Sequence, residues 1–87
     1  MLLACLTIAT CWAANAQEPT ALIEDITGAP NAGVEMMDYV YEGQKIDLGS
    51  NGVLIIAYFS NCQVETISAG KVTIGFDTST INGGKID

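Results

Sequence analysis

Apolar and polar residues alternate over short stretches of this chain, and no stretch of about ten residues follows the 3.6-residue period of a helix. The clearest alternation is KVTIGF at residues 71–76, where Val72, Ile74 and Phe76 should point inward. QKIDL at residues 44–48 alternates in the same way. Alternation with a period of two is typical of strands with one buried face, so both segments are predicted to be β-strands.

The segment VLIIAYF, residues 53–59, is apolar at every position. Such a run predicts a central strand whose two faces are both covered. Seven residues are too few for a membrane span, which needs about 20. GSNG, residues 49–52, precedes it and predicts a hairpin turn, in which Asn51-Gly52 suits a type I′ turn with two positive φ angles.

Turn residues divide the remaining chain into further short segments. ALIEDITG should be a first strand ending at Gly28, and VEMMDYVY, residues 34–41, a second strand with Met36 and Met37 on opposite faces. QVETIS, residues 63–68, predicts another strand. Asn82-Gly83-Gly84 would seat a last turn, followed by a strand that the sequence leaves unfinished.

These patterns predict an all-β protein: a small, mainly antiparallel meander, roll or sandwich whose strands are joined by glycine-containing turns. We expect three parts. Residues 1–16 are a signal peptide, residues 17–33 form a lead-in with a first short strand and a loop, and residues 34–87 form a β-domain truncated at its C-terminus.

The first 16 residues, MLLACLTIATCWAANA, are typical of a secretory signal. An apolar run leads to Ala14-Asn15-Ala16, a small-x-small pattern that predicts cleavage before Gln17. The start lacks the usual Lys or Arg, and a buried N-terminal strand or helix is the alternative. LLAC, residues 2–5, is similar to the lipoprotein box at which a cysteine is lipidated. It does not predict lipidation here, because the apolar run continues after Cys5. Export predicts a periplasmic location, with secretion as the alternative.

Charge narrows the choice of partners. The chain has ten acidic residues, three lysines and a net charge of −7, all of it after the predicted signal. A surplus of negative charge disfavours nucleic acids, whose phosphates require cationic contacts, and anionic lipid surfaces. A charged surface that keeps the chain soluble explains the composition.

The sequence predicts a protein that is not an enzyme and holds no cofactor or metal. It contains no histidine, which removes Ser-His-Asp triads, Cys-His pairs and nearly all catalytic zinc sites. No nucleotide-binding or hydrolase motif is present. The adjacent Glu24 and Asp25 would point to opposite faces of a strand, so they do not form an acid–base pair.

Aromatic residues offer the one candidate for a small-molecule site. Tyr39, Tyr41 and Tyr58 are the candidate ligand-facing side chains, together with neighbouring phenylalanines. Packing in the core is the alternative use for such rings. A ligand-binding β-domain is therefore an alternative function.

Cys62 is the only cysteine after the predicted signal peptide. Three roles are open: a buried structural thiol, a disulfide with a cysteine outside this sequence or in another chain, and a reactive thiol. Pairing is favoured, because an unpaired cysteine is unusual in an oxidising compartment. Reactivity would require nearby positive charge, and the closest lysine in the sequence is Lys71.

The order of turns and strands in YVYEGQKIDLGSNGVLIIAYFSNCQVETISAGKVTIG resembles the FecR-type periplasmic β-domain. The similarity rests on Glu42-Gly43, on the short strand Ile46-Leu48, on Gly49 to Gly52, on the apolar strand from Val53 to Ser60, and on Gly70 to Gly75. The segment from Cys62 to Ile67 is also similar to one in small exported proteins of alphaproteobacteria.

The resemblance implies a non-catalytic domain that binds an envelope protein or component and has no catalytic residues to transfer. We expect it to act through surface complementarity or through strand addition at an edge, with QVETIS or the last strand as that edge. The alternatives are a small-ligand-binding β-domain and an N-terminal fragment of a larger envelope protein or enzyme.

Overall fold

The computed structural model describes residues 18–87, so the predicted signal peptide lies outside the described residues. They form eight strands and no helix, which confirms the all-β class. The strands are β1 Ala21–Thr27, β2 Tyr39–Val40, β3 Lys45–Asp47, β4 Val53–Tyr58, β5 Val64–Ser68, β6 Lys71–Ile74, β7 Ser79–Asn82 and β8 Lys85–Ile86.

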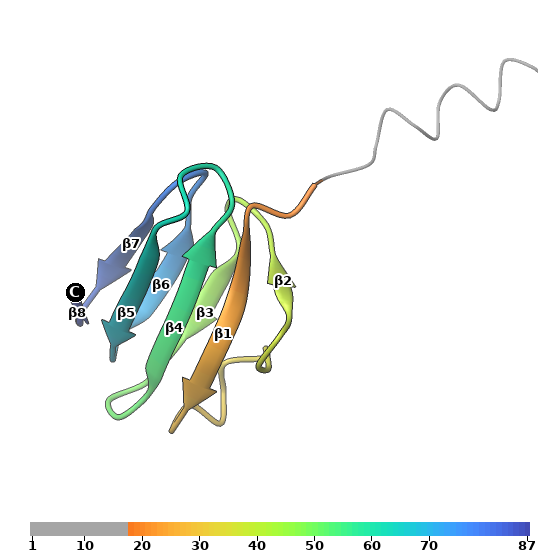
Figure 1. Cartoon of the computed structure of the whole chain (residues 1–87). Helices are drawn as coiled ribbons and strands as arrows, with labels where there is room; N and C mark the ends of the chain where they lie inside the picture. Colours follow the sequence, from red (N-terminus) through yellow and green to blue (C-terminus); the bar gives the residue numbers. More distant parts are fainter. Residues whose placement is uncertain (1–17) are drawn as a thin grey trace, which may run out of the picture.

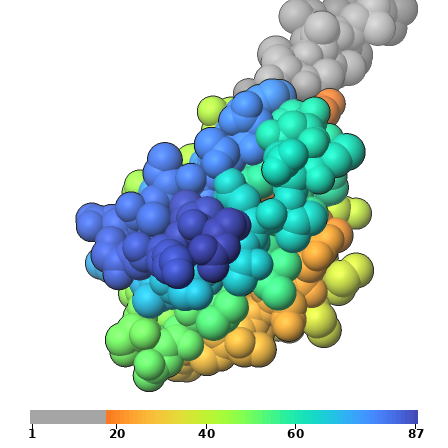
Figure 2. Space-filling model, turned by 60° about the vertical axis from the view of Figure 1, so that its left-hand side comes forward, coloured from red at the N-terminus to blue at the C-terminus, as the bar shows by residue number. Residues whose placement is uncertain are grey.

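Two antiparallel sheets face each other (Figure 1). The larger sheet has the strand order β2-β1-β4-β5-β8, and the smaller has the order β3-β6-β7. The chain therefore passes between the layers after β2, after β3, after β5 and after β7. In Figure 2 the C-terminal residues, in dark blue, lie beside the teal segment that contains β5, with which β8 pairs.

The core lies between the sheets because alternate side chains of each strand point inward. In the larger sheet Ile23 of β1 lies opposite Ile56 of β4, and Leu54 lies opposite Ile67 of β5. All four side chains are fully buried. The smaller sheet contributes Ile46, Leu48, Val72 and Ile74. Each such side chain contributes about 1.5–3 kcal/mol of hydrophobic free energy when fully buried.

The predicted central strand is confirmed, since β4 lies between β1 and β5. The prediction that both of its faces are covered is wrong for the described residues. Leu54, Ile56 and Tyr58 are buried, whereas Val53, Ile55 and Ala57 alternate with them and are only half-buried. One face of β4 packs on the smaller sheet, and the other is the outer surface of the molecule.

The hairpin predicted at GSNG is also wrong. β3 pairs with β6, and β4 pairs with β1 and β5, so residues 49–52 carry the chain from one sheet to the other. Of these four residues only Gly49 has a positive φ, 66°. Gly52 is required for a different reason, because a Cβ there would meet the Leu48 carbonyl oxygen. A turn that leaves the plane of a sheet does not need the type I′ twist.

Two of the crossings lie side by side and are joined by backbone hydrogen bonds. Gly70, between β5 and β6, accepts a hydrogen bond from Leu48 N (2.8 Å) and donates one to Gly49 O (2.8 Å). Ala69 N donates to Gly52 O, also at 2.8 Å. The crossing after β7 lies against these two, because a Cβ on Gly84 would meet the carbonyl oxygens of Ser68 and Ala69. We call the place where these three crossings meet the glycine corner.

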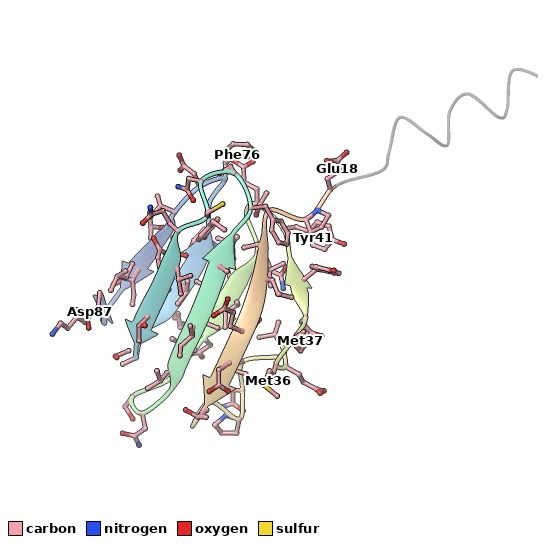
Figure 3. All side chains as sticks on the ribbon, viewed as in Figure 1. Glu18, Met36, Met37, Tyr41, Phe76 and Asp87 are labelled. Atoms are coloured by element: carbon pink, nitrogen blue, oxygen red, sulfur yellow. The ribbon has the colours of Figure 1, made fainter. Side chains whose placement is uncertain are left out.

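The predicted strand at residues 34–41 shortens to the two residues of β2. The Asp38 carboxylate accepts a hydrogen bond from Glu35 N (2.8 Å), and Asp38 N donates to Glu35 O (3.1 Å), which closes a turn. Met36 and Met37 lie in this turn and are both exposed, so the expectation that one faces inward is wrong. Figure 3 shows both methionines on the loop between β1 and β2.

Candidate interaction surface

The outer face of the smaller sheet is entirely polar. The register places Lys45, Thr73 and Thr80 in one row across the three strands. A second row consists of Asp47, Lys71 and Asn82. Such a face is compatible with water.

The outer face of the larger sheet is different. Its residues alternate with the buried ones, and the register aligns four apolar side chains in one row, which we call the apolar row: Tyr39 of β2, Leu22 of β1, Ala57 of β4 and Val64 of β5. Tyr39 and Val64, at the two ends, are 60% and 53% exposed. Ile55 occupies the next row, between Asp25 and Thr66.

An aromatic pair extends the apolar row toward one end of the sheet. The rings of Tyr39 and Phe59 have centroids 6.1 Å apart and are tilted by 59°, a favourable arrangement for two aromatic quadrupoles. Phe59 follows β4 directly and is 49% exposed. The pair is therefore held in place yet open to solvent.

A hollow of about 260 Å³ lies beside Phe59. It is lined by Glu18, Pro19, Thr20, Phe59, Ser60 and Phe76. Figure 3 places Glu18 and Phe76 at the same end of the molecule. Phe76 was expected to point inward, but β6 ends at Ile74 and the ring is 60% exposed. Loss of the strand at Gly75 removes the alternation on which that expectation rested.

Acidic residues are concentrated in the part of the chain that contains β1 and β2, which we call the β1–β2 side. Residues 18–43 contain six acids and no lysine, a net charge of −6. Residues 44–87 contain three lysines and four acids, a net charge of 3 − 4 = −1. Glu24 and Asp25 lie at a β-bulge in β1, and both are exposed. Nearly all of the net charge therefore comes from the segment that contains β1 and β2.

The three tyrosines proposed to face a ligand do not come together. Tyr39 lies on the outer face and Tyr41 is half-buried after β2. Tyr58 is 1% exposed and belongs to the core, so its proposed ligand-facing role is wrong. Phe59 was among the aromatic residues proposed to line a groove, whereas Leu22, which takes part in the apolar surface, was not predicted as a site residue. The uninterrupted apolar run at residues 53–59 was the signal for such a surface.

A polar cluster at one end of the core holds the two sheets together. The Tyr58 hydroxyl lies 2.6 Å from Ser79 Oγ of β7 and accepts a hydrogen bond from Gly75 N (3.3 Å). Glu65 of β5 pairs with Ile56 of β4, so its side chain lies on the same inner face. Its carboxylate accepts hydrogen bonds from Thr78 Oγ1 (2.5 Å) and Ser79 N (3.2 Å). Sequence parity with Ile67 could have placed Glu65 on that face.

The pKa of Tyr58 is raised above the usual value of 10.0. Desolvation by burial is the main cause, since it disfavours the phenolate; the hydrogen bonds with Ser79 and Gly75 act in the opposite direction. Glu65 and Asp77 add a smaller increase through charge repulsion. The hydroxyl is therefore neutral at ordinary pH, and its role is structural.

Cys62 lies in the turn between β4 and β5 and is exposed. The buried-thiol alternative is therefore wrong. It has a positive φ of 59°, unusual for a residue with a Cβ. Asn61 Oδ1 accepts a hydrogen bond from Gln63 N (3.1 Å) and closes this turn. No cysteine pairs with Cys62 among the residues described, and pairing elsewhere and reactivity stay open.

The expected edge strand QVETIS is paired on both sides over part of its length. β8 pairs with Ile67 and Ser68, and Asp87 exchanges two backbone hydrogen bonds with Thr66. The edges of the larger sheet are β2 and β8, each two residues long. Short edges leave little room for strand addition, so the broad outer face is the better candidate surface.

Within residues 18–87, no group of three or more acidic or cysteine side chains is arranged to hold a metal ion. No helix that could cross a membrane occurs in this part of the chain. Comparison with protein families, with curated proteins and with solved structures finds no match to this chain.

Proposed function

We propose that this chain is a non-catalytic interaction domain of the cell envelope, and that it contacts another protein through the outer face of its larger sheet. The resemblance to FecR-type periplasmic β-domains points to the same class of function. The export signal predicted at residues 1–16 would bring the domain to the periplasm.

The observation that carries this proposal is the difference between the two outer faces. One is polar throughout, whereas the other exposes an aromatic pair and the apolar row. Solvent-exposed apolar patches that are contiguous and rimmed by polar residues mark interaction sites more often than isolated apolar side chains do. An apolar strand such as β4 normally has both faces covered, and a partner on the outer face would complete that cover.

Site-specific photo-crosslinking in the native cells tests this. A photoreactive amino acid replaces Val64, at the end of the apolar row, and in a matched variant Thr80, on the outer face of the smaller sheet. Both positions are exposed, so neither change should affect folding. We expect one discrete protein adduct from position 64 and none from position 80. Adducts of equal yield at both positions, or none at position 64, would contradict the proposal.

A further inference from the structure

We infer that the partner presents a basic, amphipathic polypeptide segment, whose apolar side chains cover the apolar row and whose Lys or Arg side chains meet the carboxylates of the β1–β2 side. This inference rests on the proposed function and specifies the partner's chemistry.

Charge complementarity identifies that partner. The acids of residues 18–43 have no lysine among them, and Lys45 and Lys71 lie on the opposite outer face. Lys85, at the far edge of the larger sheet, lies 3.8 Å from Asp87. The face around Tyr39 and Leu22 thus has a negative potential, because β1 and β2 contain no cationic side chain that would offset it. Such a potential favours a positively charged segment and repels an acidic one.

The hollow beside Phe59 is suited to one cationic side chain. It combines two exposed aromatic rings, Phe59 and Phe76, with the exposed carboxylate-bearing residue Glu18. A Lys or Arg side chain packs its methylene stem against apolar surface and places its charge over an aromatic face or near a carboxylate. The volume of about 260 Å³ accommodates a single long side chain.

A second copy of this chain is the less suitable occupant. In a symmetric pair the same patch meets itself, so Glu24 and Asp25 of one copy would approach the acids of the other. Like charges brought together at an interface weaken association, and the net charge of −7 adds to the repulsion.

Peptide selection tests the inference. A library of random 12-residue peptides is displayed on phage and selected against the purified chain. We expect the selected peptides to combine Lys or Arg with apolar residues. Synthetic versions are then titrated at two salt concentrations, and their affinity should fall as salt rises, because exposed charge pairs are screened.

Charge variants locate the contact. Glu24→Gln removes one carboxylate from the β1–β2 side, and Asp47→Asn removes one from the other face as a matched control. We expect the first to weaken peptide binding about 3-fold and the second to leave it unchanged. The double variant Glu18→Gln/Glu24→Gln should weaken it further. Circular dichroism confirms that each variant is folded.

Several outcomes would overturn the inference: neutral or acidic peptides, no selected peptides, equal effects of Glu24→Gln and Asp47→Asn, or a dimer of the chain alone in sedimentation equilibrium. Because crosslinking at position 64 does not depend on peptide charge, its success beside neutral or acidic peptides would leave the proposed function standing and reject only the basic partner.

Discussion

The contact between Tyr58 and Ser79 joins the two sheets through a single buried pair of hydroxyls, and Tyr58→Phe removes it with little change in shape. The substitution takes away the oxygen that lies 2.6 Å from Ser79 Oγ and accepts from Gly75 N. Ser79 is 6% exposed, so its hydroxyl loses its partner where water has little access.

The expected loss of stability is about 1.5 kcal/mol, because a buried polar group left without a partner costs about 1–3 kcal/mol. For a domain of this size, 1 kcal/mol shifts the melting temperature by about 4–8 °C, so Tyr58→Phe should lower it by about 6–12 °C. A domain with a total stability of roughly 4–10 kcal/mol should remain folded.

A double-mutant cycle provides the assay. The free energies of unfolding are measured in urea for the wild type, Tyr58→Phe, Ser79→Ala and the double variant. Removing both hydroxyls leaves no unsatisfied partner, so we expect the double variant to lose less than the sum of the single losses, with a coupling energy of about 1 kcal/mol. Losses that add within about 0.3 kcal/mol would show that the hydroxyl pair does not join the sheets.

The raised pKa of Tyr58 also predicts how the difference in stability between the wild type and Tyr58→Phe changes with pH. Because folding raises the pKa of Tyr58, the folded state favours the neutral phenol, and this contribution to stability is fully present below pH 10.0. It is lost as the pH rises through the raised pKa. The stability advantage of the wild type over Tyr58→Phe should therefore shrink above about pH 10. An advantage that stays constant through that range would contradict the raised pKa.

Three further predictions, made with five variants, test other parts of the fold. Ile56→Ala, in the core, should cost about 3–4 kcal/mol in urea unfolding, whereas Ile55→Ala, on the outer face of the same strand, should cost about 1 kcal/mol; equal losses would mean that both faces are covered. Glu65→Gln should cost about 1 kcal/mol by weakening the hydrogen bonds to Thr78 and Ser79, and Glu24→Gln less than about 0.5 kcal/mol. Cys62→Ser should remove one equivalent of fast thiol reaction from the folded chain, since the turn exposes Cys62; an unchanged count would mean that the thiol is already paired.

Strand positions could be predicted from the sequence wherever alternation was regular. The segments at β1, β4, β5 and β6 contain enough β-branched and apolar residues to define a strand, and alternation also defined the inner face of β6 but not that of the wholly apolar β4. Before β2, the Asp38 side chain closes a turn around two methionines, and this local hydrogen bonding replaces the first part of the strand predicted at residues 34–41.

Strand pairing could not be predicted in the same way. GSNG has the composition of a hairpin turn, but composition does not tell whether the next strand returns to its neighbour or crosses to another layer. That choice depends on Gly70, about 20 residues further along the chain, whose hydrogen bonds hold the turn in place. The candidate surface was indicated only in part, by the apolar run at residues 53–59, because the apolar row forms only when β1, β2, β4 and β5 are aligned.

The repeated passage of the chain between the layers has a consequence for folding. The three-stranded sheet takes its strands from two separate stretches of sequence, with β4 and β5 of the other sheet between them. No continuous segment of the chain contains all the strands of one sheet and none of the other, so a fragment with one sheet alone cannot be cut from the chain. We therefore expect a single cooperative transition, with slow closure at the glycine corner where the crossings meet.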